Sequence, residues 1–407
     1  MERTILHCDC NAFYVSVETL LDPTLAGGPS AVCGDPESRR GIILAKNEKA
    51  KAFGVQTAET IWQARRKCPD LRLVAPHRSE YVKYSRRCNE LYLQYTDLVD
   101  PFGIDESFLD VTGTAHLFGT GEQIADELRR RMRVEVGLTI SVGVSFNRAF
   151  AKLGSDYKKP DGTTVFSRGN YKDKVWPLPV SALLYVGRHA LDKLSRLGVY
   201  TIGDLAVCDP AFLHGVFGKM GDTLLCYARG EDDEPVRPFY EEREVKSVGN
   251  SMTFAHNLVG EDECRMGLTA LCDNVGRRLR RHGLVCQTVQ LGIRDPEFRN
   301  RSRQVTLERP TNSTRALIDI SMALLRAHWQ IGRPIRLLSV TAANLLPEAQ
   351  SCEQLSLFDA AEARQAREKQ RRLDRTVDAL RERFGDQSVV FAHSVKKEDK
   401  EKEENKP

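Results

Sequence analysis

The 407-residue chain lacks any apolar run approaching the roughly 20 residues that a membrane-spanning helix requires. It also lacks a cationic leader with a cleavable apolar segment, because residues 1–4 lead straight into a strand-like stretch at 5–8. These absences predict a soluble protein without a membrane partner. The cytoplasm is its expected location.

Paired cysteine motifs are missing as well. The eleven cysteines are scattered and odd in number, and no two of them form a C-x-x-C pair. This pattern supports neither a disulfide framework nor a zinc ribbon. Most of the cysteines are expected to be small buried thiols.

Lysine is absent from residues 265–345, which contain fourteen arginines and five acidic residues and therefore have a formal charge of +9. Concentrated arginine indicates a nucleic-acid backbone partner, although arginine-rich helices can also be merely solvated. Arg299, Arg301 and Arg303 alternate, so a strand would direct all three to one face. Phosphates are their expected partners.

Three acidic residues border two apolar stretches that are far apart in the sequence. Asp9 follows residues 5–8, and Asp105 and Glu106 open a second stretch that ends near Val111. Carboxylates gathered at strand ends repel one another unless a cation neutralises them, and Mg²⁺ prefers such oxygen ligands. The pattern points to phosphoryl or nucleotidyl transfer. The alternatives are a strand-end acid at Asp9 and an exposed hairpin tip at 105–106.

The order of expected elements explains how these acids could meet. Periodicity predicts a strand at 3–8, a helix capped by Asn11, a hairpin at 98–111, a helix from Glu122 and a strand at 140–144. This is the ferredoxin-like order, which places the first strand beside the hairpin on an antiparallel sheet. Asp9 and the Asp105–Glu106 pair are then neighbours.

The second half of the chain is organised differently. Short helices with glycine punctuation follow Pro179, and Gly187 opens a segment resembling a helix-hairpin-helix, whose helix start offers N–H groups to a phosphate. An ordinary helix turn is the alternative. Residues 231–243 are charged and proline-bearing, which predicts an exposed linker before an independent α/β domain at 244–346.

A polar tail follows Pro347. It contains a predicted helix near 361–384 with four apolar residues on one stripe. The stripe consists of Leu373, Val377, Leu380 and Phe384.

Six ordered sequence blocks together resemble the Y-family, translesion DNA polymerases of the DNA polymerase IV type, over about residues 3–358. The blocks are D-C-N-A-F-Y-V-S-V-E at 9–18, A-F-G-V at 52–55, I-D-E-S-F-L-D at 104–110, S-V-G-V-S-F-N-R-A-F-A-K at 141–152, S-D-Y-K-K-P-D-G at 155–162 and Q-L-S-L-F at 354–358. Any one block would be weak, but the ordered set is specific.

The resemblance implies an α+β right-hand polymerase with a ferredoxin-like palm, small fingers, a helical thumb with a helix-hairpin-helix and a separate α/β little finger. The implied domains are a palm at 1–22 and 74–166, fingers at 23–73, a thumb at 167–230, a linker at 231–243, a little finger at 244–346 and a tail at 347–407.

The resemblance also implies the chemistry. Asp9 and Asp105 would bridge two Mg²⁺ ions, Glu106 would complete the metal nearer the primer terminus, and the Cys10 carbonyl would bind the nucleotide's metal. Such a metal pair lowers the pKa of the primer 3′-hydroxyl and clamps the attacking and leaving oxygens during transfer from a dNTP. The partners are then primer-template DNA and dNTPs.

Further positions acquire roles by the same resemblance. Tyr14 matches the steric gate that excludes a 2′-hydroxyl, the alternative being a buried aromatic residue on an amphipathic helix. Lys159 matches a triphosphate-binding lysine, and Lys51 stands where many members have arginine. The usual Tyr-x-x-Arg of the fingers is here Glu48 to Lys51, which loses an aromatic contact and bidentate geometry.

The tail block resembles a sliding-clamp-binding peptide formed by Gln354, Leu355, Leu357 and Phe358. Exposed leucines and a phenylalanine in a polar tail are unfavourable unless a groove receives them. A tether that folds back on the protein is the alternative.

The family resemblance further implies low fidelity, lesion bypass and a monomer, and no acidic set remains for a proofreading exonuclease. Two other hypotheses stay open. One is a catalytically inactive, clamp-tethered DNA-binding scaffold, and the other is a ferredoxin-like nucleotidyl cyclase.

Overall fold

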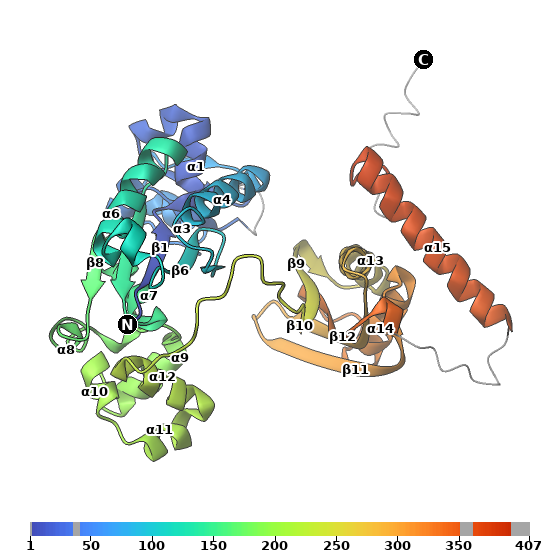
Figure 1. The fold of residues 1–407 in the computed structure, drawn as a ribbon. Helices are drawn as coiled ribbons and strands as arrows, with labels where there is room; N and C mark the ends of the chain where they lie inside the picture. Colours follow the sequence, from blue (N-terminus) through green and yellow to red (C-terminus); the bar gives the residue numbers. More distant parts are fainter. Residues whose placement is uncertain (1, 36–40, 351–360, 392–407) are drawn as a thin grey trace. The chain divides into compact units, whose positions relative to one another are not determined.

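The computed structural model describes residues 2–35, 41–350 and 361–391 and divides the chain into two compact units, Met1–Glu242 and Arg243–Pro407 (Figure 1). Each helix within these described ranges is too short or too polar to cross a membrane. The ten cysteines described are free thiols, and eight of them are buried, as expected. The predicted division into four domains and a tail is finer than these two units and stays a prediction.

A five-stranded sheet forms the centre of the first unit. Its strand order is β5-β6-β1-β7-β8, in which β1 pairs antiparallel with both β6 and β7, and β8 pairs parallel with β7. The strands are β1 (Ile5–Cys10), β5 (Val99–Pro101), β6 (Glu106–Asp110), β7 (Ile140–Ser145) and β8 (Thr163–Phe166).

Helices cover both faces of this sheet. Leu6 and Cys8 of β1 belong to a core built with α1 (Phe13–Leu21), α4 (Arg78–Tyr92) and α6 (Gly121–Arg131). Because side chains alternate along a strand, His7 and Asp9 face the opposite side, where α7 (Arg148–Tyr157) packs. Asp9 therefore lies on the side of the sheet that α7 covers.

Gly143 of β7 permits this close packing of α7. A Cβ atom on Gly143 would lie 1.9 Å from the Ala151 carbonyl oxygen and 2.5 Å from the Ser155 amide nitrogen. Only glycine leaves room for such an approach. The consequence is that Lys152 and Ser155 are held directly over β1.

A small lobe and a helical segment complete the first unit. The lobe contains a sheet of order β3-β2-β4, formed by β2 (Ser30–Cys33), β3 (Ile43–Lys46) and β4 (Arg72–Val74), with helices α2 (Glu48–Ala52) and α3 (Ile61–Lys67). The remaining helices are α5 (Ala115–Phe118), α8 (Tyr171–Lys174), α9 (Arg188–Arg196), α10 (Ile202–Ala206), α11 (Pro210–Phe217) and α12 (Lys219–Arg229).

The predicted linker at 231–243 is not exposed throughout, which corrects the expectation from sequence. Asp232 is buried, and its carboxylate accepts hydrogen bonds from the backbone N–H groups of Arg148 and Ala149, both 3.1 Å long. Val236 is also buried. The physical reason is that the unpaired N–H groups at the start of α7 need an acceptor, which this acidic segment supplies.

The second unit contains a four-stranded antiparallel sheet of order β11-β10-β12-β9. Two helices pack on one face of the sheet and close a single apolar core. The elements are β9 (Ser247–Leu258), α13 (Glu261–Arg281), β10 (Leu284–Arg294), β11 (Asn300–Thr311), α14 (Thr314–His328) and β12 (Ile335–Pro347).

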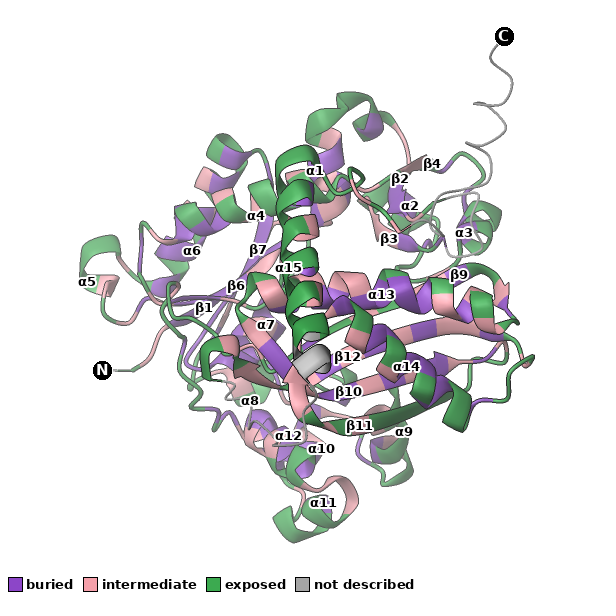
Figure 2. Cartoon of the chain, turned by 90° about the vertical axis from the view of Figure 1, so that its right-hand side faces the viewer, coloured by how far each residue is buried: buried purple, intermediate pink, exposed green. Residues whose placement is uncertain are grey.

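The tail helix α15 (Ala361–Phe384) has the predicted bounds. It contacts α13 through charged residues: Arg280 lies 2.6 Å from Asp378, and Arg381 lies 2.7 Å from Asp273. The predicted apolar stripe is largely exposed instead, as the mostly green α15 in Figure 2 shows, and 62% of Phe384 is accessible. The two units together establish a mixed α and β architecture.

Candidate active site

Strand pairing brings the predicted acidic residues together. In the register of β1 and β6, Asp9 lies directly opposite Glu106, and the two residues share the face covered by α7. Asp105 precedes Glu106, and its carbonyl oxygen accepts a 2.9 Å hydrogen bond from the Cys10 N–H. The fold thus gathers all three acidic residues at one end of the sheet, as the sequence predicted.

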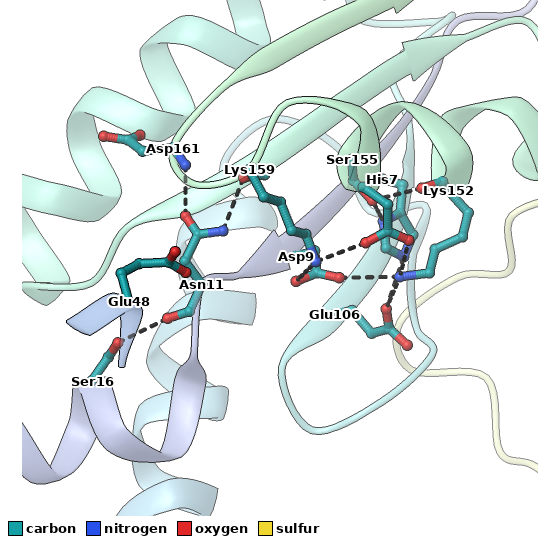
Figure 3. Close-up of polar contacts among 12 residues, drawn as sticks. His7, Asp9, Asn11, Ser16, Glu48, Glu106, Lys152, Ser155, Lys159 and Asp161 are labelled. Atoms are coloured by element: carbon teal, nitrogen blue, oxygen red, sulfur yellow. Dashed lines mark hydrogen bonds and ion pairs between the residues drawn. The ribbon is translucent and has the colours of Figure 1, made fainter. Parts of the chain in front are cut away.

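Lys152 of α7 lies over this cluster. Its ammonium group is 2.6 Å from Glu106 Oε2 and 3.1 Å from Asp9 Oδ2 (Figure 3). It also lies 3.4 Å from Asp156 Oδ2, one helical turn further along α7. One cation therefore links the two strands to the helix.

Lys159 lies on the other side of Asp9 (Figure 3). Its ammonium group is 2.8 Å from Asp9 Oδ1 and 2.8 Å from Asp156 Oδ1. Asp9, Lys152, Asp156 and Lys159 consequently form a closed ring of alternating charge, and Glu106 is joined to it through Lys152. We call these five residues the charge ring.

His7 lies directly behind the acidic residues and is fully buried. Its Nδ1 is 2.8 Å from Ser155 Oγ, and its Nε2 lies 3.4 Å from Glu106 Oε2. Ligand atoms of His7, Asp9 and Glu106 all lie within 4.8 Å of one another. A buried ring nitrogen beside two carboxylates is suited to face a cation.

The pKa values of Asp105 and Glu106 are shifted in opposite directions. Burial, together with the charges of Asp9 and Glu106, raises the pKa of Asp105 to about 6. Burial acts in the same direction on Glu106, but hydrogen bonds and charge from His7 and Lys152 outweigh it and lower the pKa of Glu106 to about 2. The cluster therefore holds more negative charge than its lysines neutralise.

These residues fit a divalent metal ion. The carboxylates of Asp9, Asp105 and Glu106 supply hard oxygen donors, the ligand type that Mg²⁺ and Mn²⁺ prefer. The pKa of Asp105 is raised by burial and by the neighbouring carboxylates, so its ionised form is disfavoured when no cation is bound. Protein carboxylates in such numbers, together with substrate phosphates, are a common way to hold Mg²⁺.

The residue predicted as a steric gate lies at the start of α1, immediately after β1. Tyr14 is half-buried and stacks on Tyr81, with ring centroids 4.3 Å apart and planes 13° apart. The Tyr81 hydroxyl in turn donates to the Glu18 carboxylate. The Tyr14 ring is therefore held against Tyr81 while part of the residue remains exposed.

Asn11 connects β1 to the loop that contains Lys159. Its Oδ1 accepts a 2.8 Å hydrogen bond from the Asp161 N–H, and its Nδ2 donates to Ser141 Oγ at 2.9 Å (Figure 3). The loop is thereby held against the strand that carries Asp9. Asn11 supports the site without contributing a carboxylate to it.

The two predicted triphosphate ligands have different surroundings. Lys159 contacts the charge ring, as described above. Lys51 is on α2, where it is exposed and pairs with Glu48 at 3.3 Å. Thus the structure brings Lys159, but not the Lys51 ammonium as it is placed here, into contact with the acidic residues.

The three arginines predicted to contact DNA are not all in the same strand. Arg301 and Arg303 face the same side of β11, opposite the core residues Ile293 and Leu291 of β10, so they lie on the helix-covered side of an exposed edge strand. Figure 2 shows β11 as largely exposed. Arg299 precedes the strand and donates its N–H to Asp295. The strand is expected to direct all three arginines to one face, and it does so for Arg301 and Arg303.

The uncovered face of the same sheet is formed by small polar residues. It borders a cavity of about 600 Å³ lined by Gly249, Ser251, Gly292, Ser302, Ser339 and Thr341. Arg294 is at its edge. In the first unit, Gly187 is exposed at the N-cap of α9, and no side chain caps that helix.

The predicted clamp-binding residues Gln354, Leu355, Leu357 and Phe358 lie outside the described residues. The sequence prediction also missed three residues of the site, His7, Lys152 and Asp156. The period of two in β1 could have indicated His7, since it shares a face with Asp9. The spacing of four between Lys152 and Asp156 places them on one helix face, but does not reveal which way that face points.

Comparisons with known proteins agree with this arrangement. The impB/mucB/samB family matches residues 8–156, and the C-terminal domain of the same family matches residues 245–357. The chain is 46% identical to DNA polymerase IV of Acetivibrio thermocellus, with 96% of each chain covered. It is 38% identical to DNA polymerase IV of Pelotomaculum thermopropionicum, with 97% of this chain and 96% of the relative covered.

A solved structure is similar as well. A Y-family DNA polymerase chimera matches 84% of this chain and 99% of its own, with a TM-score of 0.74 and 22% sequence identity. At that identity the match establishes the fold, and the predicted α+β class is confirmed.

Proposed function

Given that the chain belongs to the impB/mucB/samB family, as a Y-family DNA polymerase of the DNA polymerase IV type, we propose that it extends primers by two-metal nucleotidyl transfer. It is a DNA-directed DNA polymerase that performs translesion synthesis. Its substrates are primer-template DNA and dNTPs. The observation that supports the two-metal proposal most strongly is the convergence of Asp9, Asp105 and Glu106 at one end of the sheet.

Asp9 and Asp105 would hold two Mg²⁺ ions, with Glu106 on the ion nearer the primer and the Cys10 carbonyl on the nucleotide's ion. When bound, the ions supply Lewis acidity at the primer hydroxyl and the phosphates. The chain's own contribution is positioning: β1 and β6 fix the carboxylates before substrate arrives, so little reorganisation remains at the moment of reaction.

Lys159 is suited to contact the triphosphate because a lysine is a compact cation for phosphate oxygens, and its loop is fixed by Asn11. Lys51 is the second proposed contact, which requires its ammonium to leave Glu48. An anionic triphosphate offers more charge than the exposed Glu48 carboxylate, so this exchange is favourable.

Tyr14 is proposed as the steric gate, because its ring is held against Tyr81 and is partly exposed. Tyr14→Ala should increase ribonucleotide insertion relative to deoxynucleotide insertion by about 100-fold, the scale on which a pocket discriminates one hydroxyl. Tyr14→Phe keeps the ring and serves as the control. Unchanged sugar selection by Tyr14→Ala in single-nucleotide insertion would reject the gate.

We propose DNA contacts on both units. The uncapped start of α9 at Gly187 offers N–H groups to a phosphate, and Arg299, Arg301 and Arg303 offer exposed cations. The small polar residues of the uncovered sheet face would let a nucleic-acid backbone approach closely, since they present little steric bulk.

Residues 354–358 are proposed to bind the sliding clamp, which would raise the effective concentration of the enzyme at the primer terminus. Deleting these residues should reduce clamp-stimulated synthesis and spare synthesis without the clamp. Equal loss of both activities would indicate a structural tether. A cytoplasmic, monomeric enzyme without proofreading completes the proposal.

A primed-template assay tests the overall proposal against its two rivals. Purified chain, Mg²⁺, dNTPs and a labelled primer should yield primers extended according to the template. A scaffold would bind the DNA without extending it, whereas a cyclase would form cyclic product from ATP or GTP alone. Either of these results would refute the polymerase assignment.

A further inference from the structure

Lys152 is a mostly buried cation that meets carboxylates from three different elements. It is rooted on α7, yet its ammonium group contacts a carboxylate from β1, one from β6 and one from its own helix. Only 16% of its side chain is accessible. Burial opposes its charge, but Asp9, Asp156 and Glu106 together raise the pKa of Lys152, so it remains an ammonium.

The position of this ammonium coincides with a place where a metal ion would be held. Glu106 Oε2 and Asp9 Oδ2 are its closest partners, and ligand atoms of these same two residues belong to the group that lies within 4.8 Å of one another. Two cations cannot share the space between two carboxylates without strong repulsion. A divalent ion bound by both oxygens must therefore displace the Lys152 ammonium.

Asp156 provides the place to which the ammonium can retreat. It already lies 3.4 Å from Lys152, and it is not one of the carboxylates assigned to metal. Lys152 and Asp156 are four residues apart on α7, a spacing at which side chains meet on one helix face. A small rotation of the lysine side chain can thus exchange its partners without moving the helix.

We propose that Lys152 is a positioning residue that holds Asp9 and Glu106 together until a divalent cation replaces its ammonium, and that Asp156 retains the displaced side chain. This inference rests on the proposed two-metal function. Lys152 prevents the carboxylates from separating by mutual repulsion, and it also lowers the affinity of the site for metal because the metal must displace it.

Mn²⁺ binding to the full chain without DNA or nucleotide tests this competition, with electron paramagnetic resonance counting free Mn²⁺. Lys152→Met should bind Mn²⁺ at least about tenfold more tightly than wild type, because a charge at this range shifts ion affinity by one to three orders of magnitude. Lys152→Arg keeps the charge and should stay near wild type. Asp156→Asn removes the alternative partner and should bind more weakly.

Lys158→Met is the matched control, because it removes one lysine from the same segment, at an exposed position beside the charge ring. Tighter binding by Lys152→Met but not by Lys158→Met supports the proposal. Equal or weaker binding by Lys152→Met overturns it, provided that Glu106→Gln reduces binding and so locates the site.

A separate outcome would overturn the proposed metal centre itself. If wild type, Lys152→Met and Glu106→Gln all bind Mn²⁺ equally, then both the two-metal function and this inference are wrong. If all three fail to bind it, this inference is wrong, and the two-metal function is tested by Mn²⁺ binding in the complex with primer-template DNA and dNTP. Thermal unfolding in chelator checks that Lys152→Met is folded, and its melting temperature should rise more on adding Mn²⁺ than that of wild type.

Discussion

Both units of this protein contain clusters of charged side chains, but the clusters are balanced differently. In the first unit, four carboxylates, those of Asp9, Asp105, Glu106 and Asp156, surround Lys152 and Lys159. In the second unit, α15 and α13 are joined by ion pairs in which each arginine meets nearby aspartates, as Arg381 meets Asp273.

The difference separates a site from a docking surface. Surplus buried charge of one sign destabilises a fold unless a ligand neutralises it, so it persists where a ligand binds. The ion pairs of the second cluster join three arginines to four aspartates, which is nearer to balance, and they can fix one helix against another without a ligand. On this view, the first cluster binds metal and substrate, and the second cluster positions the tail helix α15.

The largest expected effect is on catalysis. Glu106→Gln should reduce primer extension by about 1,000-fold, because several kcal/mol of transition-state stabilisation depend on the metal ligands. Glu127→Gln is the control, since Glu127 is a partly exposed carboxylate on α6 that pairs with Arg130, away from the charge ring. Extension at near wild-type rates by Glu106→Gln would remove the first cluster from the mechanism.

Arg280 tests the second cluster. It is almost fully buried, contacts Asp374 and Asp378 of α15, and donates to the Asn312 carbonyl. Arg280→Ala should lower the free energy of unfolding of the second unit by about 3 kcal/mol, because it leaves buried carboxylates unpaired. Chemical denaturation measures this loss, and Arg281→Ala, at the exposed neighbouring position, is the control.

The contrast becomes sharper if primer extension is measured for the same variant. Arg280→Ala should retain extension at a temperature where the second unit is folded. Loss of activity without loss of stability would mean that the second cluster is functional and that the comparison is misleading.

Asp105 should show the opposite behaviour, with activity lost and stability gained. Its pKa of about 6 in the folded chain exceeds the value of about 3.9 for an unfolded aspartate. The folded state therefore favours the protonated form, and the stability this gives is present below about pH 4 and lost as the pH rises through 6.

Asp105→Asn removes the charge that folding disfavours. In chelator at pH 8, the free energy of unfolding of Asp105→Asn should exceed that of wild type by about 2 kcal/mol. At pH 4 the difference should vanish. Reduced stability of Asp105→Asn at pH 8 would show that the charge of Asp105 does not destabilise the folded chain.

The smallest expected effect concerns the edge strand of the second unit. Arg303→Ala should weaken DNA binding similarly for all DNA sequences. It should also reduce the magnitude of the slope of log K against log salt concentration by about one. Arg315→Ala, which removes an exposed arginine of α14 that pairs with Asp319, is the control. An unchanged salt dependence would mean that Arg303 is only solvated.

Sequence could predict the meeting of Asp9 with Glu106, because strand alternation and the ferredoxin-like order fix both face and neighbour. It could not predict that Lys152 points at them. That outcome depends on the side of α7 that faces the sheet, which is decided by close packing over Gly143. Local pattern contains no information about such a tertiary contact.

The tail shows the same limit. The spacing of Leu373, Leu380 and Phe384 predicts a helix correctly, but it does not reveal which face of that helix packs on the second unit. In the structure the charged face contacts α13, because Arg280 and Asp273 offer stronger partners than the apolar core, which α13 and α14 already close. The linker differs from expectation for a related reason, since Asp232 caps α7.

The central claim is that Asp9, Asp105 and Glu106 form one centre for two metal ions. Its most direct test is the number of Mn²⁺ ions bound per chain in a complex with primer-template DNA that lacks a 3′-hydroxyl and with the matching dNTP. The expected result is two ions for wild type and fewer for Asp9→Asn. No bound Mn²⁺ in wild type, or an equal number in Asp9→Asn, would contradict the account.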